Sequence, residues 1–140
     1  MQMQLKRMKR WLAVGALALG SSAALAGLVS DQPVSVTLNG DGSGSAFGSM
    51  TTARFSKNDV EFIGCGLRRI DDGAGGVFLF AFCQAADAAN VQGFCTTDNP
   101  NLIASIGDQD DFSFITFSWN TAGECRSIGN STQSFYIPKK

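Results

Sequence analysis

The sequence predicts an all-β protein, a small antiparallel β-sandwich, with a small β-barrel as the alternative. Short apolar segments recur at regular spacing between turns rich in Gly, Asn and Asp, which is typical of such folds. No segment after residue 26 has a convincing amphipathic helical pattern. Eleven phenylalanines, all beyond residue 26, are expected to supply the core. Four cysteines in the same region predict two disulfides.

The N-terminus has the three parts of an export signal. Residues 6–10 are mostly basic, Trp11–Leu19 is apolar, and Ala24-Leu25-Ala26 matches the small-residue pattern that a signal peptidase cleaves. We therefore predict a signal peptide, residues 1–26, and a single secreted β-domain, residues 27–140. The alternative is an uncleaved membrane anchor over Trp11–Val29, which the cleavage pattern disfavours. The predicted location is periplasmic or extracellular, with membrane contact only through the signal peptide during export.

Removing the signal peptide changes the charge balance. Residues 27–140 keep seven Lys and Arg against twelve Asp and Glu, which gives a net charge of −5. A nucleic-acid partner requires a basic surface to neutralise phosphates. We therefore expect no nucleic-acid binding.

The first strands lie before a central hairpin. Val34–Leu38 alternates polar and apolar residues and predicts a strand. Asn39–Ser45 is a turn by composition, because Gly, Asn and Asp tolerate turn geometry. Ala46–Ser56 is a strand candidate interrupted by Gly48. Ser56–Asp59 then turns the chain into the hairpin.

The central hairpin spans Val60–Ala85 and has one cysteine in each arm. If the glycine-rich turn Asp72–Gly76 is centred on Ala74, Cys65 lies opposite Cys83 in an antiparallel pair. Directly opposed residues lie near the distance that a disulfide requires.

The two faces of this hairpin are both apolar. Ile63, Cys65 and Leu67 share one face with Leu79, Ala81 and Cys83, because side chains alternate along a strand. Phe78, Phe80 and Phe82 occupy the other face, with glycines opposite that leave room for the rings. This pattern predicts a central strand in a two-layer structure.

Further short strands are predicted beyond the hairpin. Ala85–Asn90 is a loop or a single helical turn, and the regions Asp98–Asn101 and Gly107–Asp111 are turns. In total the pattern indicates eight or nine strands. The remaining strand candidates are Val91–Thr97, Leu102–Ile106, Phe112–Trp119, Glu124–Ile128 and Ser134–Ile137.

Four cysteines allow three disulfide connectivities. The hairpin register favours Cys65–Cys83, which leaves Cys95–Cys125. The competing pair is Cys83–Cys95, because a second hairpin centred near Ala89 also sets these two residues opposite each other. Zinc binding is disfavoured, because the chain has no histidine and no Cys-x-x-Cys spacing.

The composition leaves little catalytic chemistry, and we predict no catalytic residues. Without histidine, Ser-His-Asp and Cys-His systems are excluded in their usual forms. Paired aspartates, Asp71 with Asp72 and the group Asp108, Asp110 and Asp111, leave an aspartate-based hydrolase as a distant alternative. Aspartates in turns more commonly accept hydrogen bonds from nearby backbone amides. No cofactor is expected beyond Ca²⁺, for which Asp108, Asp110 and Asp111 are the candidate ligands.

We therefore expect a non-catalytic binding or interaction module for a protein partner or a glycan. Trp119 and Tyr136 are candidate sugar-stacking side chains, although the apolar strand around Trp119 favours a core position for it. The alternative is an extracellular structural subunit that assembles by β-strand addition, with Val34–Leu38 as the donor strand. Self-assembly is compatible with both functions.

Overall fold

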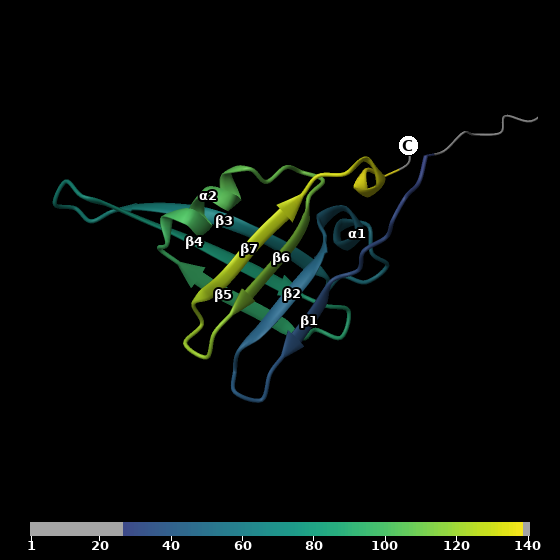
Figure 1. Ribbon diagram of the computed structural model, residues 1–140, viewed down its shortest axis with the longest axis horizontal. Coiled ribbons are helices and arrows are strands. Elements are labelled where there is room, and N and C mark those ends of the chain that lie inside the picture. The colour runs from purple at the N-terminus through teal and green to yellow at the C-terminus, as the bar shows by residue number, and fades with distance from the viewer. Residues whose placement is uncertain (1–26, 139–140) are drawn as a thin grey trace, which may run out of the picture.

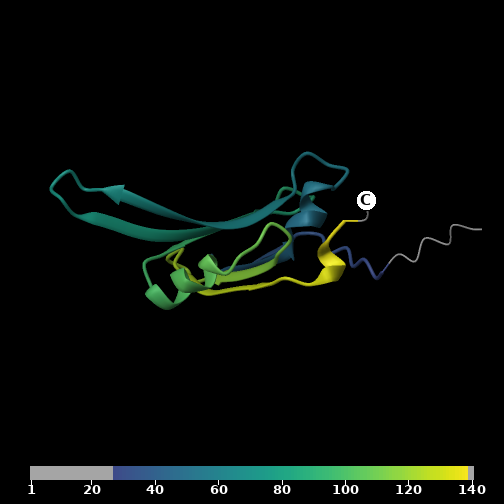
Figure 2. The ribbon, with the colours of Figure 1, turned by 90° about the horizontal axis from the view of Figure 1, so that it is seen from above.

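The computed structural model describes residues 27–138, which form two antiparallel sheets packed face to face (Figures 1 and 2). One sheet has the strand order β1-β2-β6-β7 and the other β3-β4-β5. The sandwich prediction is confirmed, and the sheets of the described residues do not close into a barrel. The predicted signal peptide, residues 1–26, lies outside the described residues. Within residues 27–138, no helix is both long and apolar enough to cross a bilayer.

The four-stranded sheet contains β1 (Ser35–Leu38), β2 (Gly44–Ser49), β6 (Phe114–Trp119) and β7 (Cys125–Ser131). Its strands alternate between buried and exposed positions, as expected for a sheet covered on one face. Ile115 and Phe117 of β6 are completely buried and lie at the centre of the core. Two tight turns, β1–β2 and β6–β7, bring the outer strands of this sheet back against the inner ones.

The three-stranded sheet contains β3 (Phe62–Asp71), β4 (Val77–Ala86) and β5 (Gln92–Thr97). The predicted register is confirmed: Cys65 pairs with Cys83 and Leu67 with Ala81. In the β3–β4 turn, Gly73 and Gly75 have φ angles of 73° and 90°, which side-chain-bearing residues rarely adopt. The hairpin projects well beyond the other sheet (Figure 2).

Three helical segments correct the strand predictions. α1 (Met50–Arg54) replaces the second half of the strand predicted over Ala46–Ser56. α2 (Pro100–Gly107) stands where Leu102–Ile106 was predicted as a strand, because Asn99 caps the helix and Pro100 suits its first turn. Ser134–Tyr136 is a 3-10 turn rather than a closing strand. Seven strands therefore form in residues 27–138, not eight or nine.

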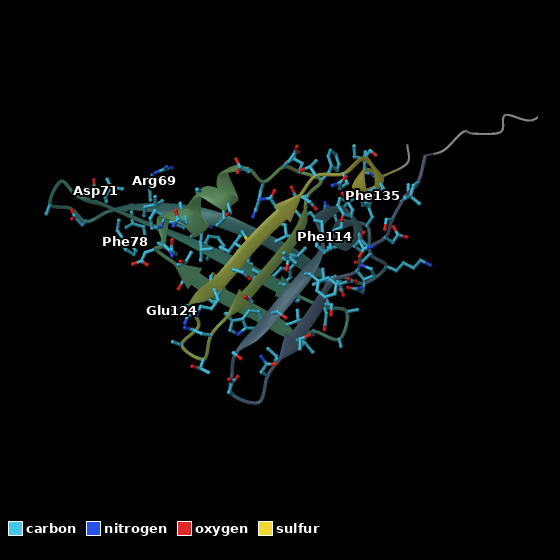
Figure 3. All side chains as sticks on the ribbon, viewed as in Figure 1. Arg69, Asp71, Phe78, Phe114, Glu124 and Phe135 are labelled. Atoms are coloured by element: carbon cyan, nitrogen blue, oxygen red, sulfur yellow. A yellow bond between two sulfur atoms is a disulfide. The ribbon has the colours of Figure 1, made fainter. Side chains whose placement is uncertain are left out.

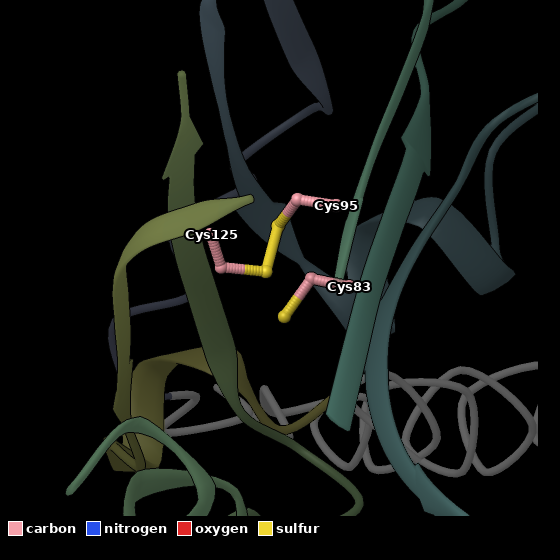
Figure 4. A group of neighbouring side chains, drawn as sticks. All are labelled: Cys83, Cys95 and Cys125. Carbon is pink, nitrogen blue, oxygen red and sulfur yellow. A yellow bond between two sulfur atoms is a disulfide. The ribbon is translucent and has the colours of Figure 1, made fainter. Parts of the chain in front are cut away.

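Both disulfides have the favoured connectivity. Cys65–Cys83 links the neighbouring strands β3 and β4, with a Cα–Cα distance of 4.0 Å. Cys95–Cys125 crosses the core from β5 to β7 with a Cα–Cα distance of 5.0 Å, and therefore ties the two sheets together (Figure 4). Cys83 also lies directly opposite Cys95 in the β4–β5 ladder. The register that favoured the competing pair thus exists without that bond.

The prediction that phenylalanines supply the core is wrong for most of them. Phe117 is completely buried, as are small residues such as Ala46, Ala81 and Ala85. Several phenylalanines are exposed instead. These are Phe47, Phe55, Phe62, Phe78, Phe94 and Phe112.

Candidate functional site

The outer face of the three-stranded sheet carries a row of four phenylalanines, which we call the aromatic strip: Phe78, Phe80, Phe82 and Phe94. The first three alternate along β4, and Phe94 continues the row on β5. Neighbouring ring centroids are 5.6 Å apart for Phe78–Phe80 and 6.5 Å for Phe80–Phe82 and Phe82–Phe94. These separations are typical of aromatic pairs that attract each other. The strip is therefore a continuous surface rather than a set of scattered side chains.

The strip is exposed because the sandwich covers only the opposite face of its sheet. Cys83 and Cys95 point inward and are completely buried, so the intervening residues of β4 and β5 must point outward. Phe78 and Phe94 are 55% and 56% exposed. Apolar side chains gathered on one exposed face commonly mark an interaction surface.

Two features of β3 hold the Phe82 ring in place. Gly66 lies directly opposite Phe82, and a Cβ atom at Gly66 would approach the ring to 2.9 Å. The prediction that a glycine opposite makes room for the ring is therefore confirmed for Phe82, whereas Arg68 and Ile70 lie opposite Phe80 and Phe78. The Arg68 guanidinium lies over the same ring, 4.7 Å from its centroid, in cation–π geometry. Since Arg68 is itself exposed, the strip has a positive charge at its margin.

The turn aspartates have local structural roles. Asp71 Oδ1 accepts the N–H of Gly73 at 2.7 Å, and Asp72 Oδ1 accepts those of Ala74 and Gly76 at 2.8 and 2.9 Å. These hydrogen bonds to Ala74 and Gly76 lower the pKa of Asp72 from its ordinary value of 3.8. The expectation that turn aspartates accept backbone amide hydrogens is confirmed here.

Asp72→Asn is expected to weaken the acid dependence of stability. The pKa of Asp72 is lowered in the folded protein, so its stabilisation is present above the ordinary value of 3.8 and disappears as pH falls through the lowered pKa. Asparagine keeps an acceptor oxygen in the turn but does not titrate. Melting temperatures from about pH 6 to about pH 2 should therefore fall less steeply for the variant than for the wild type. Parallel curves would contradict this role.

The acidic segment after α2 does not assemble a recognisable ion site. Asp108 is the C-cap of α2, and Asp110, through its backbone, exchanges hydrogen bonds with Ser113. Asp108, Asp110 and Asp111 are all exposed, and their carboxylates are not among the groups of three potential ligands brought together in residues 27–138. The calcium site stays a prediction without geometric support.

A cluster of three cysteine sulfurs also lacks metal-binding chemistry. The Sγ atoms of Cys83, Cys95 and Cys125 lie within 4.8 Å of one another (Figure 4). All three cysteines are in disulfides, and no free cysteine exists among the described residues. A metal ligand must be a thiolate, so the bonded sulfurs cannot serve.

The two candidate sugar-stacking side chains are not on an open platform. Trp119 is only 7% exposed and packs against Phe117, and its indole N–H donates to the Gly42 carbonyl at 3.2 Å. Tyr136 is half-buried and stacks on Phe114, with ring centroids 5.6 Å apart. The core position expected for Trp119 is confirmed.

The strand pattern places Phe78, Phe80 and Phe82 on one face but does not by itself identify that face as the surface, and it does not connect Phe94 or Arg68 with it. The cysteines carry the signal that could identify the exposed face. A disulfide between layers, such as Cys95–Cys125, must lie inside, and Cys83 lies opposite Cys95 on the same face, so residues that alternate with these two cysteines face outward in a two-layer sandwich. Comparison of the chain with protein-family models, curated proteins and solved structures found no match.

Proposed function

We propose that the protein is an exported, non-catalytic binding module that recognises a partner protein through the aromatic strip. The observation that carries this proposal is a continuous aromatic surface on an exposed sheet face, with Phe78 and Phe94 each more than half exposed. Aromatic side chains and arginine are the residues most enriched where protein partners bind tightly. The partner surface is apolar and carries a carboxylate that reaches Arg68.

The stacking within the strip favours a protein over a glycan. Sugar binding uses the open face of an aromatic ring. The Phe78 and Phe80 rings are inclined by 26° and stack on each other, and Phe82 and Phe94 stack at 29°. Arg68 covers part of the Phe82 ring as well. Rings whose faces are partly covered in this way offer edges and gaps, which suit aliphatic and aromatic side chains.

The available chemistry supports binding rather than catalysis. The chain has no histidine, and the four cysteines are paired in two disulfides. Asp41 and Asp72 have pKa values lowered by hydrogen bonds, whereas a carboxyl that acts as a general acid near neutral pH needs a raised pKa.

Export is part of the proposal. Two disulfides form and persist in oxidising compartments, which supports a periplasmic or extracellular location. The predicted signal peptide, residues 1–26, supplies the route. An intact mass that begins at Gly27 and gains four hydrogens on reduction would support export; free thiols or a retained N-terminal segment would oppose it.

The alternative of strand donation has less support. Ser35–Leu38 of the suggested donor segment is already paired with β2 in its own chain. Donation to another subunit would require β1 to leave that pairing first. We therefore place the structural-subunit function second.

A defined peptide library tests the binding proposal. Random linear peptides displayed on phage are selected on the wild-type protein, and the selected peptides are then titrated against Phe94→Ser. We expect at least a roughly tenfold loss of affinity, because truncating an aromatic anchor removes most of its contact. Phe55→Ser is the matched control, because Phe55 is 69% exposed but lies at the end of α1, away from the strip.

Two outcomes would contradict the proposal. Equal affinity of the peptides for Phe94→Ser and wild type would show that the strip is not the recognition surface. Binding to insoluble cellulose or chitin that is lost in Phe82→Ser would favour the glycan function instead. Phe94 is exposed and Phe82 is half-buried, so thermal unfolding should show that Phe94→Ser and Phe82→Ser keep the fold.

A further inference from the structure

β4 has one edge that is only partly occupied. Ala81–Ala86 pairs with both β3 and β5, whereas Val77–Phe80 pairs with β3 alone. β5 ends at Thr97, and the chain then turns into α2, which begins at Pro100. The edge of β4 from Val77 to Phe80 is therefore open on the side that β5 has left.

The hydrogen-bonding pattern shows which backbone groups face this opening. Cys65 and Cys83 are 4.0 Å apart at Cα, the close spacing of a pair that exchanges no backbone hydrogen bonds. Bonded and non-bonded pairs alternate, so odd-numbered positions of β4 direct their N–H and C=O groups away from β3. Val77 and Leu79 are the odd-numbered positions beyond the end of β5.

Hydrogen bonds in the two turns confirm this alternation. The N–H of Asp72 donates to the Gly76 carbonyl at 3.1 Å, which continues the even-numbered bonded pairs of β3 and β4. The N–H of Asp87 donates to the Val91 carbonyl at 3.1 Å, which continues the odd-numbered bonded pairs of β4 and β5. The N–H and C=O groups of Val77 and Leu79 consequently form a short template for another strand.

The surroundings of this edge leave room for a strand. A groove of about 540 Å³ lies beside it, between Phe78 and Phe80 on one side and Asp98, Glu124 and Arg126 on the other. Figure 3 shows Phe78 on the projecting hairpin and Glu124 on the β6–β7 turn.

Apolar side chains gather at the same place. Ile70 is 52%, Val77 66% and Phe78 55% exposed, and all three lie next to the β3–β4 turn. Native sheets commonly protect an open edge with charge, proline or a bulge. Val77–Phe80 itself has none of these.

We propose that this edge pairs with the same edge of a second copy of the chain, antiparallel about a two-fold axis. Val77 lies opposite the partner's Leu79, and Phe78 lies opposite the partner's Phe78. Because the backbone groups of Val77 and Leu79 point to the open edge of β4, this register satisfies their four N–H and C=O groups with four hydrogen bonds to the partner. A shift by one residue would place a position whose N–H and C=O groups point to the open edge opposite a position whose groups point to β3.

One further observation favours a second copy as the occupant. The end of the hairpin carries Arg68 and Arg69 with Asp71 and Asp72, so its net charge is zero in a domain of net charge −5. Two such ends meet without the repulsion that other acidic surfaces of the chain would bring. An interface that contacts its own copy through one patch also closes as a dimer and does not extend into a fibre.

The dimer would join the two aromatic strips into one surface. Phe78 meets its counterpart at a close, non-bonded pair on the outer face, and Ile70 lies beside Phe78 in each copy. A row of four apolar side chains then crosses the interface. The self-association is separate from partner recognition, since it uses the β4 edge rather than the whole strip.

Sedimentation equilibrium tests the dimer, with the mass of wild type measured over about 1 µM to 1 mM protein. We expect the mass to rise from monomer to dimer. Phe78→Asp should abolish this rise, because two carboxylates would face each other across the two-fold axis. Phe94→Asp is the matched control: Phe94 is equally exposed on the same face but lies on β5, so the dimer should persist.

A second pair of variants tests the backbone pairing itself. Leu79→Pro removes an N–H that points to the open edge of β4 and should raise the dimer dissociation constant about tenfold or more. Arg69→Pro is its control, because Arg69 lies opposite Leu79 in the ladder and directs its N–H to the other edge of the hairpin. This control should dimerise like wild type.

The outcomes separate the two proposals. A wild type that stays monomeric at the highest concentration, or a dimer that survives Phe78→Asp and Leu79→Pro, would overturn the β4-edge dimer. Loss of peptide binding in Phe94→Ser without any dimer would leave the binding function intact. A dimer whose Phe94→Ser variant still binds peptides would refute the binding function alone.

Discussion

Replacing Cys95 and Cys125 together by alanine is expected to lower the free energy of unfolding by about 4 kcal/mol. This disulfide closes a loop of 30 residues and joins β5 to β7 across the core. The longer the loop, the more a cross-link restricts the unfolded chain. Both cysteines are almost completely buried, at 0% and 5% exposed. Domains of this size are typically stable by only about 5–15 kcal/mol, so the loss should be plain in guanidinium unfolding.

The other disulfide provides the comparison. Cys65–Cys83 closes 18 residues and links strands that a ten-pair ladder already holds together. Replacing both by alanine should therefore lower the free energy of unfolding less, by about 3 kcal/mol. Trp119 is the sole tryptophan of residues 27–140 and pairs with Cys125, so its fluorescence reports the packing between sheets. A larger loss for Cys65–Cys83 would contradict the structural role assigned to the inter-sheet bond.

The central hairpin could be predicted in detail because its constraints are local. A glycine-rich turn centred on Ala74 sets Cys65 opposite Cys83, and the structure has this register. Alternation then determines the face of every other residue in both arms. The second disulfide follows by elimination once this pair is accepted.

α2 could not be recognised from its apolar residues alone. Leu102, Ile103 and Ile106 share one side of the helix and pack on the core, but eight residues are too few to display a helical period clearly. The better signals were at its start, where Asn99 accepts the N–H of Asn101 at 2.9 Å and Pro100 follows as the first helical residue. The composition of Asp98–Asn101 predicts a turn, and helix caps share that composition.

The candidate site was hidden for a different reason. The strand pattern shows that both faces of β4 are apolar, but it does not show how many layers the fold contains. With a third layer, Phe78 and Phe82 would have been core residues. Since two layers form, and Cys83 and Cys95 occupy the covered face, the phenylalanines lie on the surface. Exposure is a property of the assembled sheets, which no short segment encodes.

Trp119 packs between two glycines, one on its own sheet and one on the facing sheet. Its indole ring lies against the backbone of Gly93 on β5 and Gly44 on β2, and a Cβ atom at Gly93 would approach the ring to 2.5 Å. The indole N–H is also held by the Gly42 carbonyl. Because Gly44 lies against the ring as well, the ring cannot move away from a larger residue at position 93 without further clashes.

Gly93→Ala is therefore expected to destabilise the domain by about 1–3 kcal/mol, the usual effect of overpacking a core. Gly64→Ala is the matched control, since Gly64 also lies within a strand of the same sheet but has open space around its Cβ position. It should change the free energy of unfolding by less than about 0.5 kcal/mol. Trp119→Phe should reduce the penalty of Gly93→Ala in a double-mutant cycle, because a smaller ring leaves room for the methyl group. Additive effects in that cycle would show that the alanine clashes elsewhere, and that the sheets are not held at this distance by Trp119.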